Sequence, residues 1–121
     1  MHIVFIDDEE VILELIAQSL EEEYEATIEK FVGLTQALDY IKCCNDPIDL
    51  IISDYHLDDG TGLELFGQIC ERSIPFILMT GMQLDTDSPE VTEFLKGSKN
   101  LIVEKPISDE LLFSAVNKLI L

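Results

Sequence analysis

Four strand-like apolar runs in this chain end at residues that can bind a metal ion or a phosphoryl group. The run 48–52 is too apolar to alternate, which is typical of a strand buried on both faces of a parallel sheet. Parallel strands share one edge at their carboxyl ends and lie about 4.8 Å apart, so we expect these residues to lie close together. They are Asp7 and Asp8 after 3–6, Asp54 after 48–52, Thr80 at the end of 75–80, and Lys105 after 101–103.

Three carboxylates this close repel one another unless a cation lies between them, and oxygen ligands with few side chains suit Mg²⁺ with several retained waters. Lys105 would add a second positive charge. Phosphoryl transfer needs an acceptor oxygen in line, a metal and a lysine to neutralise the equatorial oxygens, and a hydroxyl to hydrogen-bond one of them. The pattern therefore predicts Asp54 as the acceptor and Thr80 as the hydroxyl.

Each residue also has a simpler explanation. Asp7 to Glu10 could be negative charge favoured at a helix N-terminus, and Asp54 could cap a turn. Thr80 could be an ordinary strand-end residue, and Lys105 a solvated residue before a turn proline. The joint occurrence at four strand ends, in the right order, favours a common site over four independent accidents.

The elements that would position these residues alternate five strands with five helices, which predicts right-handed crossovers and a sheet covered on both sides. The fold class is therefore α/β, a three-layer doubly wound five-stranded parallel sheet. Its order 2-1-3-4-5 is carried over from the flavodoxin-like group. We expect an edge strand within 24–31 and a first helix burying Ile12, Leu15, Ile16, Ser19 and Leu20. Helix starts are predicted from Thr61 with Glu64 for helix 62–72, from Ser88 with Pro89, and from Ser108, with a stop at Gly97.

Composition limits the possible partners. The 121 residues predict one domain, 1–121, and 7 Lys+Arg against 25 Asp+Glu give a net charge of −18. Nucleic acid and membrane surfaces draw mainly on Lys and Arg, so we expect neither as a partner. The three cysteines show no CxxC spacing, and the chain shows no signal peptide or membrane-spanning run, which together predict reduced thiols and a cytoplasmic protein.

Asp7-Asp8-Glu9, Asp54 with Gly62 eight residues later, Thr80-Gly81 and Lys105-Pro106 resemble the receiver domain of two-component response regulators, of the chemotaxis-regulator type. The resemblance covers nearly the whole chain. It implies that Asp54 takes a phosphoryl group from a phosphohistidine on a sensor histidine kinase or phosphotransfer protein, while Thr80 and Lys105 contact the phosphoryl oxygens. Such a chain is a signalling phosphoacceptor that assists its own phosphorylation and dephosphorylation, not a conventional enzyme.

The resemblance also implies a ligand set and an output. Mg²⁺ would be bound directly by Asp8 and Asp54, through water by Asp7, and by the backbone carbonyl of His56. The Lys105–Pro106 peptide bond would be cis. Because the chain carries no output domain, we expect its signal to reach a downstream protein through the fourth helix, fifth strand and fifth helix.

Four positions depart from the family pattern or tune it. Ile102 stands where an aromatic switch residue is usual, so another form of the switch is expected. Asp58 stands where proline is common, which is expected to loosen the loop beside the site. His56 and Met82 occupy positions that influence how fast the acyl phosphate hydrolyses, and we expect substitutions there to change its lifetime.

Two other classes of function fit parts of the pattern. A phosphatase of the haloacid-dehalogenase type would use Asp7 as its nucleophile, but it expects aspartate where Glu9 stands, and the chain is short for that group. A phosphorylation-independent binding module would keep the fold and use the acidic face as a dock. It predicts equal partner affinity with and without a phosphoryl mimic.

Overall fold

The computed structural model of the protein describes residues 1–81 and 84–120, so Met82 lies outside the described residues. The strands of its main sheet are β1 (His2–Ile6), β2 (Thr27–Phe31), β3 (Leu50–Asp54), β6 (Phe76–Thr80) and β7 (Asn100–Glu104). They pair in parallel in the order β2-β1-β3-β6-β7. This confirms the predicted order, with a short hairpin inserted after the third strand of the sheet.

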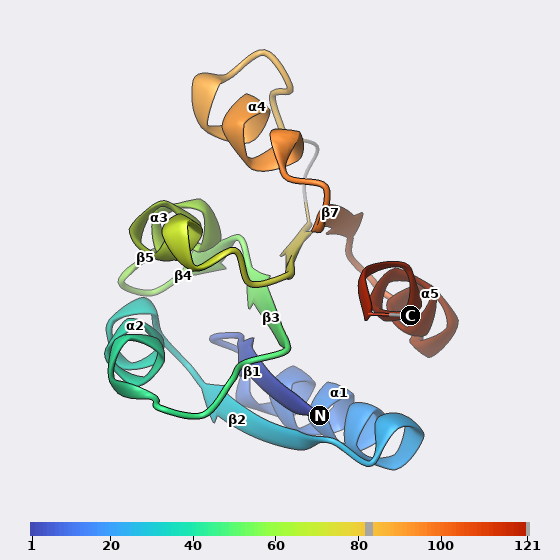
Figure 1. The fold of residues 1–121 in the computed structure, drawn as a ribbon. Helices are drawn as coiled ribbons and strands as arrows, with labels where there is room; N and C mark the ends of the chain where they lie inside the picture. Colours follow the sequence, from blue (N-terminus) through green and yellow to red (C-terminus); the bar gives the residue numbers. More distant parts are fainter. Residues whose placement is uncertain (82–83, 121) are drawn as a thin grey trace.

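Helices cover both faces of the sheet. They are α1 (Glu10–Tyr24), α2 (Leu34–Cys43), α3 (Gly62–Ile69), α4 (Pro89–Lys96) and α5 (Asp109–Ile120). In Figure 1, α1 and α5 lie on one side, whereas α2, α3 and α4 lie on the other. Each side has its own apolar core, and the central strands β3 and β6 are buried along their whole length. The three-layer α/β prediction is confirmed.

Capping residues start the helices where the sequence predicts. The Thr61 hydroxyl accepts a hydrogen bond from the Glu64 N–H at 3.1 Å, and α3 follows directly. Ser88 and Ser108 do the same for α4 and α5, with donors three residues on at 3.2 Å in both cases. Gly97 ends α4 as expected. Each cap fixes the residue at which its helix begins, and so it also fixes the length of the loop between that helix and the preceding strand.

The face of α1 that packs on the sheet differs from the predicted one. Leu20 is buried as expected, but Leu15 is 59% exposed, and Ile12, Ile16 and Ser19 are only half-buried. The residues that α1 buries are Leu13, Ala17 and Leu20. The segment contains two apolar stripes offset by one position, and packing against the sheet selects the stripe that includes the small Ala17.

Two boundaries also differ, and one hairpin is new. Tyr24 ends α1 instead of opening the edge strand, because its hydroxyl donates to Asn117 Oδ1 at 2.8 Å and its ring contacts Phe113. The third helix ends as a 3-10 turn over Cys70–Arg72. The loop after Asp54 contains an antiparallel hairpin of β4 (His56–Leu57) and β5 (Gly60–Thr61), which the sequence did not predict.

All three cysteines are free, in keeping with the predicted reduced thiols. Within the described residues, we find no helix with the length and apolar character needed to cross a membrane.

Candidate functional site

Backbone hydrogen bonds fix the strand ends that carry the candidate site. The Asp7 N–H donates to the Phe31 carbonyl at 3.0 Å, which holds the end of β1 against β2. The Tyr55 N–H donates to Met79, and the Lys105 N–H donates to the Thr80 carbonyl, both at 2.7 Å. The backbones that carry the phosphoacceptor candidate and the lysine are therefore tied to β6 from its two sides.

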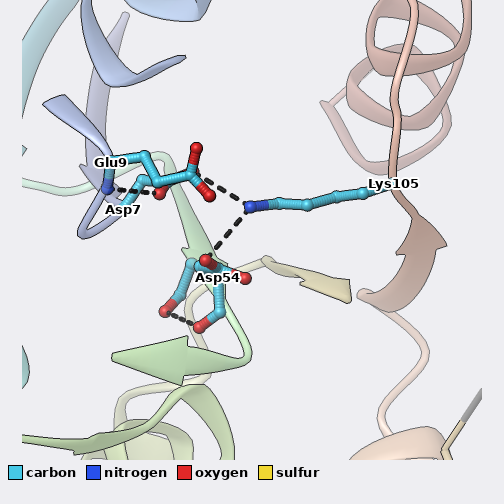
Figure 2. A network of polar contacts seen from close by, with 5 residues as sticks. Asp7, Glu9, Asp54 and Lys105 are labelled. Atoms are coloured by element: carbon cyan, nitrogen blue, oxygen red, sulfur yellow. Dashed lines mark hydrogen bonds and ion pairs between the residues drawn. The ribbon is translucent and has the colours of Figure 1, made fainter. Parts of the chain in front are cut away.

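Lys105 joins two carboxylates from different strands. Its Nζ lies 3.0 Å from Asp54 Oδ2 and 3.3 Å from Asp7 Oδ2 (Figure 2). The Asp7 side chain is fully buried, and the Glu9 N–H donates to its other oxygen, Oδ1, at 2.9 Å. Burial disfavours the charge on Lys105, but its hydrogen bond to Asp54 and the charge of Asp7 outweigh that cost and raise the pKa of the lysine. The ammonium group is thus held charged between two acids.

Asp8 completes a cluster of three carboxylates. One oxygen from each of Asp7, Asp8 and Asp54 lies within 4.8 Å of the others, as expected for neighbouring strand ends. Burial raises the pKa of Asp7, and burial together with the charges of Asp7 and Asp58 raises the pKa of Asp8. A single lysine does not balance these charges. An all-oxygen set with this spacing fits a hard divalent cation such as Mg²⁺.

The burial and mutual repulsion of these carboxylates lead to a prediction about Asp8. A carboxyl whose pKa is raised by folding lowers stability as pH rises from its unfolded pKa through its folded one. Asp8→Asn should therefore stabilise the metal-free protein at pH 7 by on the order of 1 kcal/mol or less after solvent screening, or roughly 4 °C in the unfolding midpoint. The measurement is thermal unfolding in chelator. Added Mg²⁺ should stabilise wild type and leave the variant unchanged.

The control for Asp8→Asn is Asp39→Asn, which removes an exposed acid from α2. Its midpoint should stay within about 1 °C of wild type, since exposed charges contribute little. The gain in Asp8→Asn should shrink as pH falls through the raised folded pKa and vanish below about pH 3, well under the unfolded pKa of about 3.9, where the carboxyl is protonated in both the folded and the unfolded chain. A gain that persists there would contradict the electrostatic explanation.

Gly62 lets α3 start against the backbone of the phosphoacceptor candidate. A Cβ at this position would lie 2.5 Å from Leu78 Cδ1 and 2.7 Å from the Asp54 carbonyl oxygen. The leucine can rotate, but the carbonyl belongs to a buried strand and cannot move freely. Gly62 therefore allows a close approach that any side chain would prevent.

We expect Gly62→Ala to destabilise the protein by about 2–3 kcal/mol, because an added methyl group overpacks this contact. Urea unfolding measures the loss. Gly67→Ala is the matched control, since Gly67 lies inside α3 and a Cβ there meets no atom within 4 Å. The control should gain up to about 1 kcal/mol from helix propensity. Equal effects in the two variants would refute the packing argument.

Thr80 and His56 are located by their positions in the sheet and in the hairpin. Thr80 is 1% exposed at the end of β6, one residue past Met79, the partner of Asp54 in the sheet register. The His56 side chain is exposed, and its ring contacts Tyr55 edge-on at 4.8 Å between centroids. Its backbone lies two residues after Asp54. The Lys105–Pro106 peptide bond is cis, as the resemblance implies.

The hairpin and the role of Asp59 at its turn were not predicted from the sequence. The Asp59 carboxylate accepts hydrogen bonds from the Leu34 and Thr35 N–H groups, at the N-terminus of α2. The one signal in the sequence is Gly33, which precedes a predicted helix without offering a capping side chain of its own. A cap supplied from 25 residues away leaves no local pattern.

Comparison with known proteins gives one family. The profile described as response regulator receiver domain matches residues 3–117. A receiver domain protein from Methanospirillum hungatei JF-1, described as CheY-like, has a TM-score of 0.79 at 26% identity, over 97% of this chain and 90% of its own. The signal receiver domain of an HD domain-containing protein from Pseudomonas fluorescens Pf-5 scores 0.79 at 28% identity, over 98% and 92%.

A two-component response regulator from Clostridium difficile shares the fold, with a TM-score of 0.81 at 22% identity over 98% of this chain and 94% of its own. No curated protein sequence matched the chain significantly.

Proposed function

This chain belongs to the response regulator receiver domain family, and we propose that its Asp54 accepts a phosphoryl group in a two-component phosphorelay. The single observation that carries this proposal is the contact of Asp54 Oδ2 with Lys105 Nζ at 3.0 Å, beside the Asp7 and Asp8 carboxylates. An acceptor oxygen, a fixed cation and a set of metal ligands thus come together at one sheet edge, which is what phosphoryl transfer requires.

The residues divide the chemistry among them. Asp54 Oδ forms a new bond to phosphorus as the N–P bond of a phosphohistidine breaks, and the imidazole leaves with the bonding electron pair. Lys105 neutralises charge on the phosphoryl oxygens, and the Thr80 hydroxyl donates a hydrogen bond to one of them. Asp7 orients Lys105 through their 3.3 Å contact. The aspartyl phosphate formed on Asp54 stays at the sheet edge, where the same site can also assist its hydrolysis.

Mg²⁺ is the proposed cofactor. Asp8 and Asp54 would bind it directly, Asp7 through water, and the backbone carbonyl of His56 would be a further ligand. When bound, the cation neutralises carboxylate and phosphoryl charge, which lets anionic groups approach one another. Burial, together with the charges of Asp7 and Asp58, raises the pKa of Asp8, which supports this assignment because a bound cation would offset the cost of the buried charge and the repulsion.

The partners follow from the proposed chemistry. The phosphoryl donor would be a sensor histidine kinase or phosphotransfer protein. The output would be a downstream protein that contacts α4, β7 and α5. The proposal includes no binding to nucleic acid or membrane, and it places the protein in the cytoplasm.

Ile102 is half-buried and packs with the core beneath α2, α3 and α4, so a switch in this chain would repack an aliphatic side chain instead of swinging a ring. The effect of His56 and Met82 on phosphoryl lifetime stays a prediction.

The test is incubation with a small phosphodonor such as acetyl phosphate, with and without Mg²⁺, followed by intact mass. We expect one phosphoryl group per chain, formed only with the divalent cation. The adduct should be lost at alkaline pH, because acyl phosphates hydrolyse readily there. An adduct that forms equally well in chelator, or none at all, would refute the proposal.

A further inference from the structure

Asp59 ties the β4–β5 hairpin, which follows Asp54, to the first turn of α2. Its Oδ1 accepts from the Leu34 N–H at 2.7 Å, and its Oδ2 accepts from the Thr35 N–H at 3.0 Å. Both N–H groups belong to the first turn of α2, where the helix itself offers them no acceptor. Gly33, the residue that should cap this helix, has no side chain, and an added Cβ would lie 3.1 Å from Asp59 Oδ1. The glycine thus leaves room for the carboxylate.

A second contact reinforces the first. A Cβ built on Gly60 would lie 2.5 Å from Leu34 Cδ2, so the hairpin backbone packs directly on the first residue of α2. The hydrogen bonds from Thr35 and Leu34 lower the pKa of Asp59, so the carboxylate is charged at neutral pH. A negative charge is favourable at a helix N-terminus. Asp59 and Gly60 together fix the hairpin against α2.

The base of the hairpin is held by the Gly62 N–H, which donates to the Tyr55 carbonyl at 2.8 Å, and by the buried Leu57 side chain, so it is the turn of the hairpin that needs a separate contact. The segment 54–62 contains no proline. Asp58, at the hairpin turn, adds a charge that repels Asp8. Without an opposing contact, this repulsion would push the hairpin away from the carboxylate cluster. The bonds from Asp59 to α2 act from the other end of the turn.

We propose that Asp59 is a positioning residue for the divalent cation site, because its carboxylate ties the β4–β5 hairpin, and with it the backbone of His56, to the N-terminus of α2. The inference rests on the proposed function for the ligand role of His56. Asp59 itself does not touch the cation. It acts by limiting the motion of the segment that supplies a ligand, as partners behind metal ligands generally do.

The test compares Mg²⁺ affinity by calorimetry at pH 7 in wild type, Asp59→Ala and Asp39→Ala. The last variant removes the same charge from the exposed side of α2. We expect Asp59→Ala to bind Mg²⁺ roughly tenfold more weakly, at the low end of effects seen for groups that orient metal ligands. Asp39→Ala should stay within about twofold, since exposed charges are screened. Equal losses in both variants would overturn the proposal.

Gly33→Ser in the Asp59→Ala background separates positioning from helix capping. The serine can cap α2 locally, because Gly33 is extended at φ −147° and ψ 164° and the crowding carboxylate is gone. We expect the urea midpoint to recover while Mg²⁺ affinity stays weak. Phosphorylation by acetyl phosphate should be slow at low Mg²⁺ and normal at saturating Mg²⁺. Recovered Mg²⁺ affinity in the double variant would reduce Asp59 to a structural cap and refute the proposal.

The outcomes also separate this inference from the proposed function. Wild type that binds Mg²⁺ but gains no phosphoryl group would refute phosphoryl acceptance and leave the role of Asp59 decided by the affinities. Wild type that binds no Mg²⁺ would overturn both.

Discussion

Asp54→Asn is expected to abolish phosphorylation by acetyl phosphate and Mg²⁺, with a loss of at least about a hundredfold in the rate of adduct formation, since the covalent acceptor itself is removed. An amide nitrogen or oxygen does not form a stable phosphoryl adduct under these conditions. The fold should survive, because the change removes one of three clustered carboxylates and keeps the shape of the side chain. Intact mass over time measures the adduct, and circular dichroism checks the fold.

Asp7→Asn is the matched comparison and separates two chemistries. A receiver domain places the phosphoryl group on Asp54, so Asp7→Asn should still form the adduct, more slowly because Lys105 loses its 3.3 Å partner. The phosphatase of the haloacid-dehalogenase type predicts the reverse, with the intermediate on Asp7. Family membership favours the first reading. An adduct that survives in Asp54→Asn and disappears in Asp7→Asn would contradict it.

Residues at strand ends were the most predictable part of the site. The buried strands β1 and β3 and the half-buried β7 each contain an apolar run, and the end of the run fixes which side chain reaches the sheet edge. Asp7, Asp54 and Lys105 could therefore be brought together from sequence, because parallel pairing puts all such ends on one side. Their spatial meeting is confirmed by the 3.0 and 3.3 Å contacts. Their chemical roles stay predictions.

Features that depend on packing between distant segments could not be predicted. In α1, Leu13 and Leu15 each fit an apolar stripe, and only the sheet decides which one is buried. The hairpin strands are two residues long, too short for a period of two to appear in the sequence. Asp59 caps a helix that begins 25 residues before it, so no local motif marks it.

The acidic composition acquires a specific meaning at the site. Of the 25 acids, Asp7, Asp8 and Asp54 form one cluster beside Lys105, and the charge of Asp58 acts on Asp8. Such a cluster destabilises the metal-free fold and favours any process that brings positive charge to it. Lys105 is therefore expected to serve two separable purposes, the stability of the resting protein and the rate of phosphoryl transfer.

Lys105→Met tests this division, because methionine keeps much of the side-chain length and removes the charge. The rate of phosphoryl transfer should fall by roughly 10²–10³, the range for losing one fixed electrostatic contact to a reacting group. Stability of the metal-free protein should fall by about 1–2 kcal/mol, less than for a fully buried pair because the lysine side chain is 21% exposed. Acetyl phosphate kinetics and urea unfolding in chelator measure the two losses.

Magnesium distinguishes the two purposes of the lysine. Saturating Mg²⁺ should restore most of the lost stability in Lys105→Met, because the cation then neutralises Asp7, Asp8 and Asp54. It should not restore the transfer rate, because a cation held by the carboxylates cannot replace an ammonium group that contacts a different phosphoryl oxygen. Lys99→Met, an exposed lysine just before the amino end of β7, is the control and should match wild type in both measurements. A Lys105→Met rate that recovers fully at high Mg²⁺ would show that the lysine only offsets carboxylate repulsion.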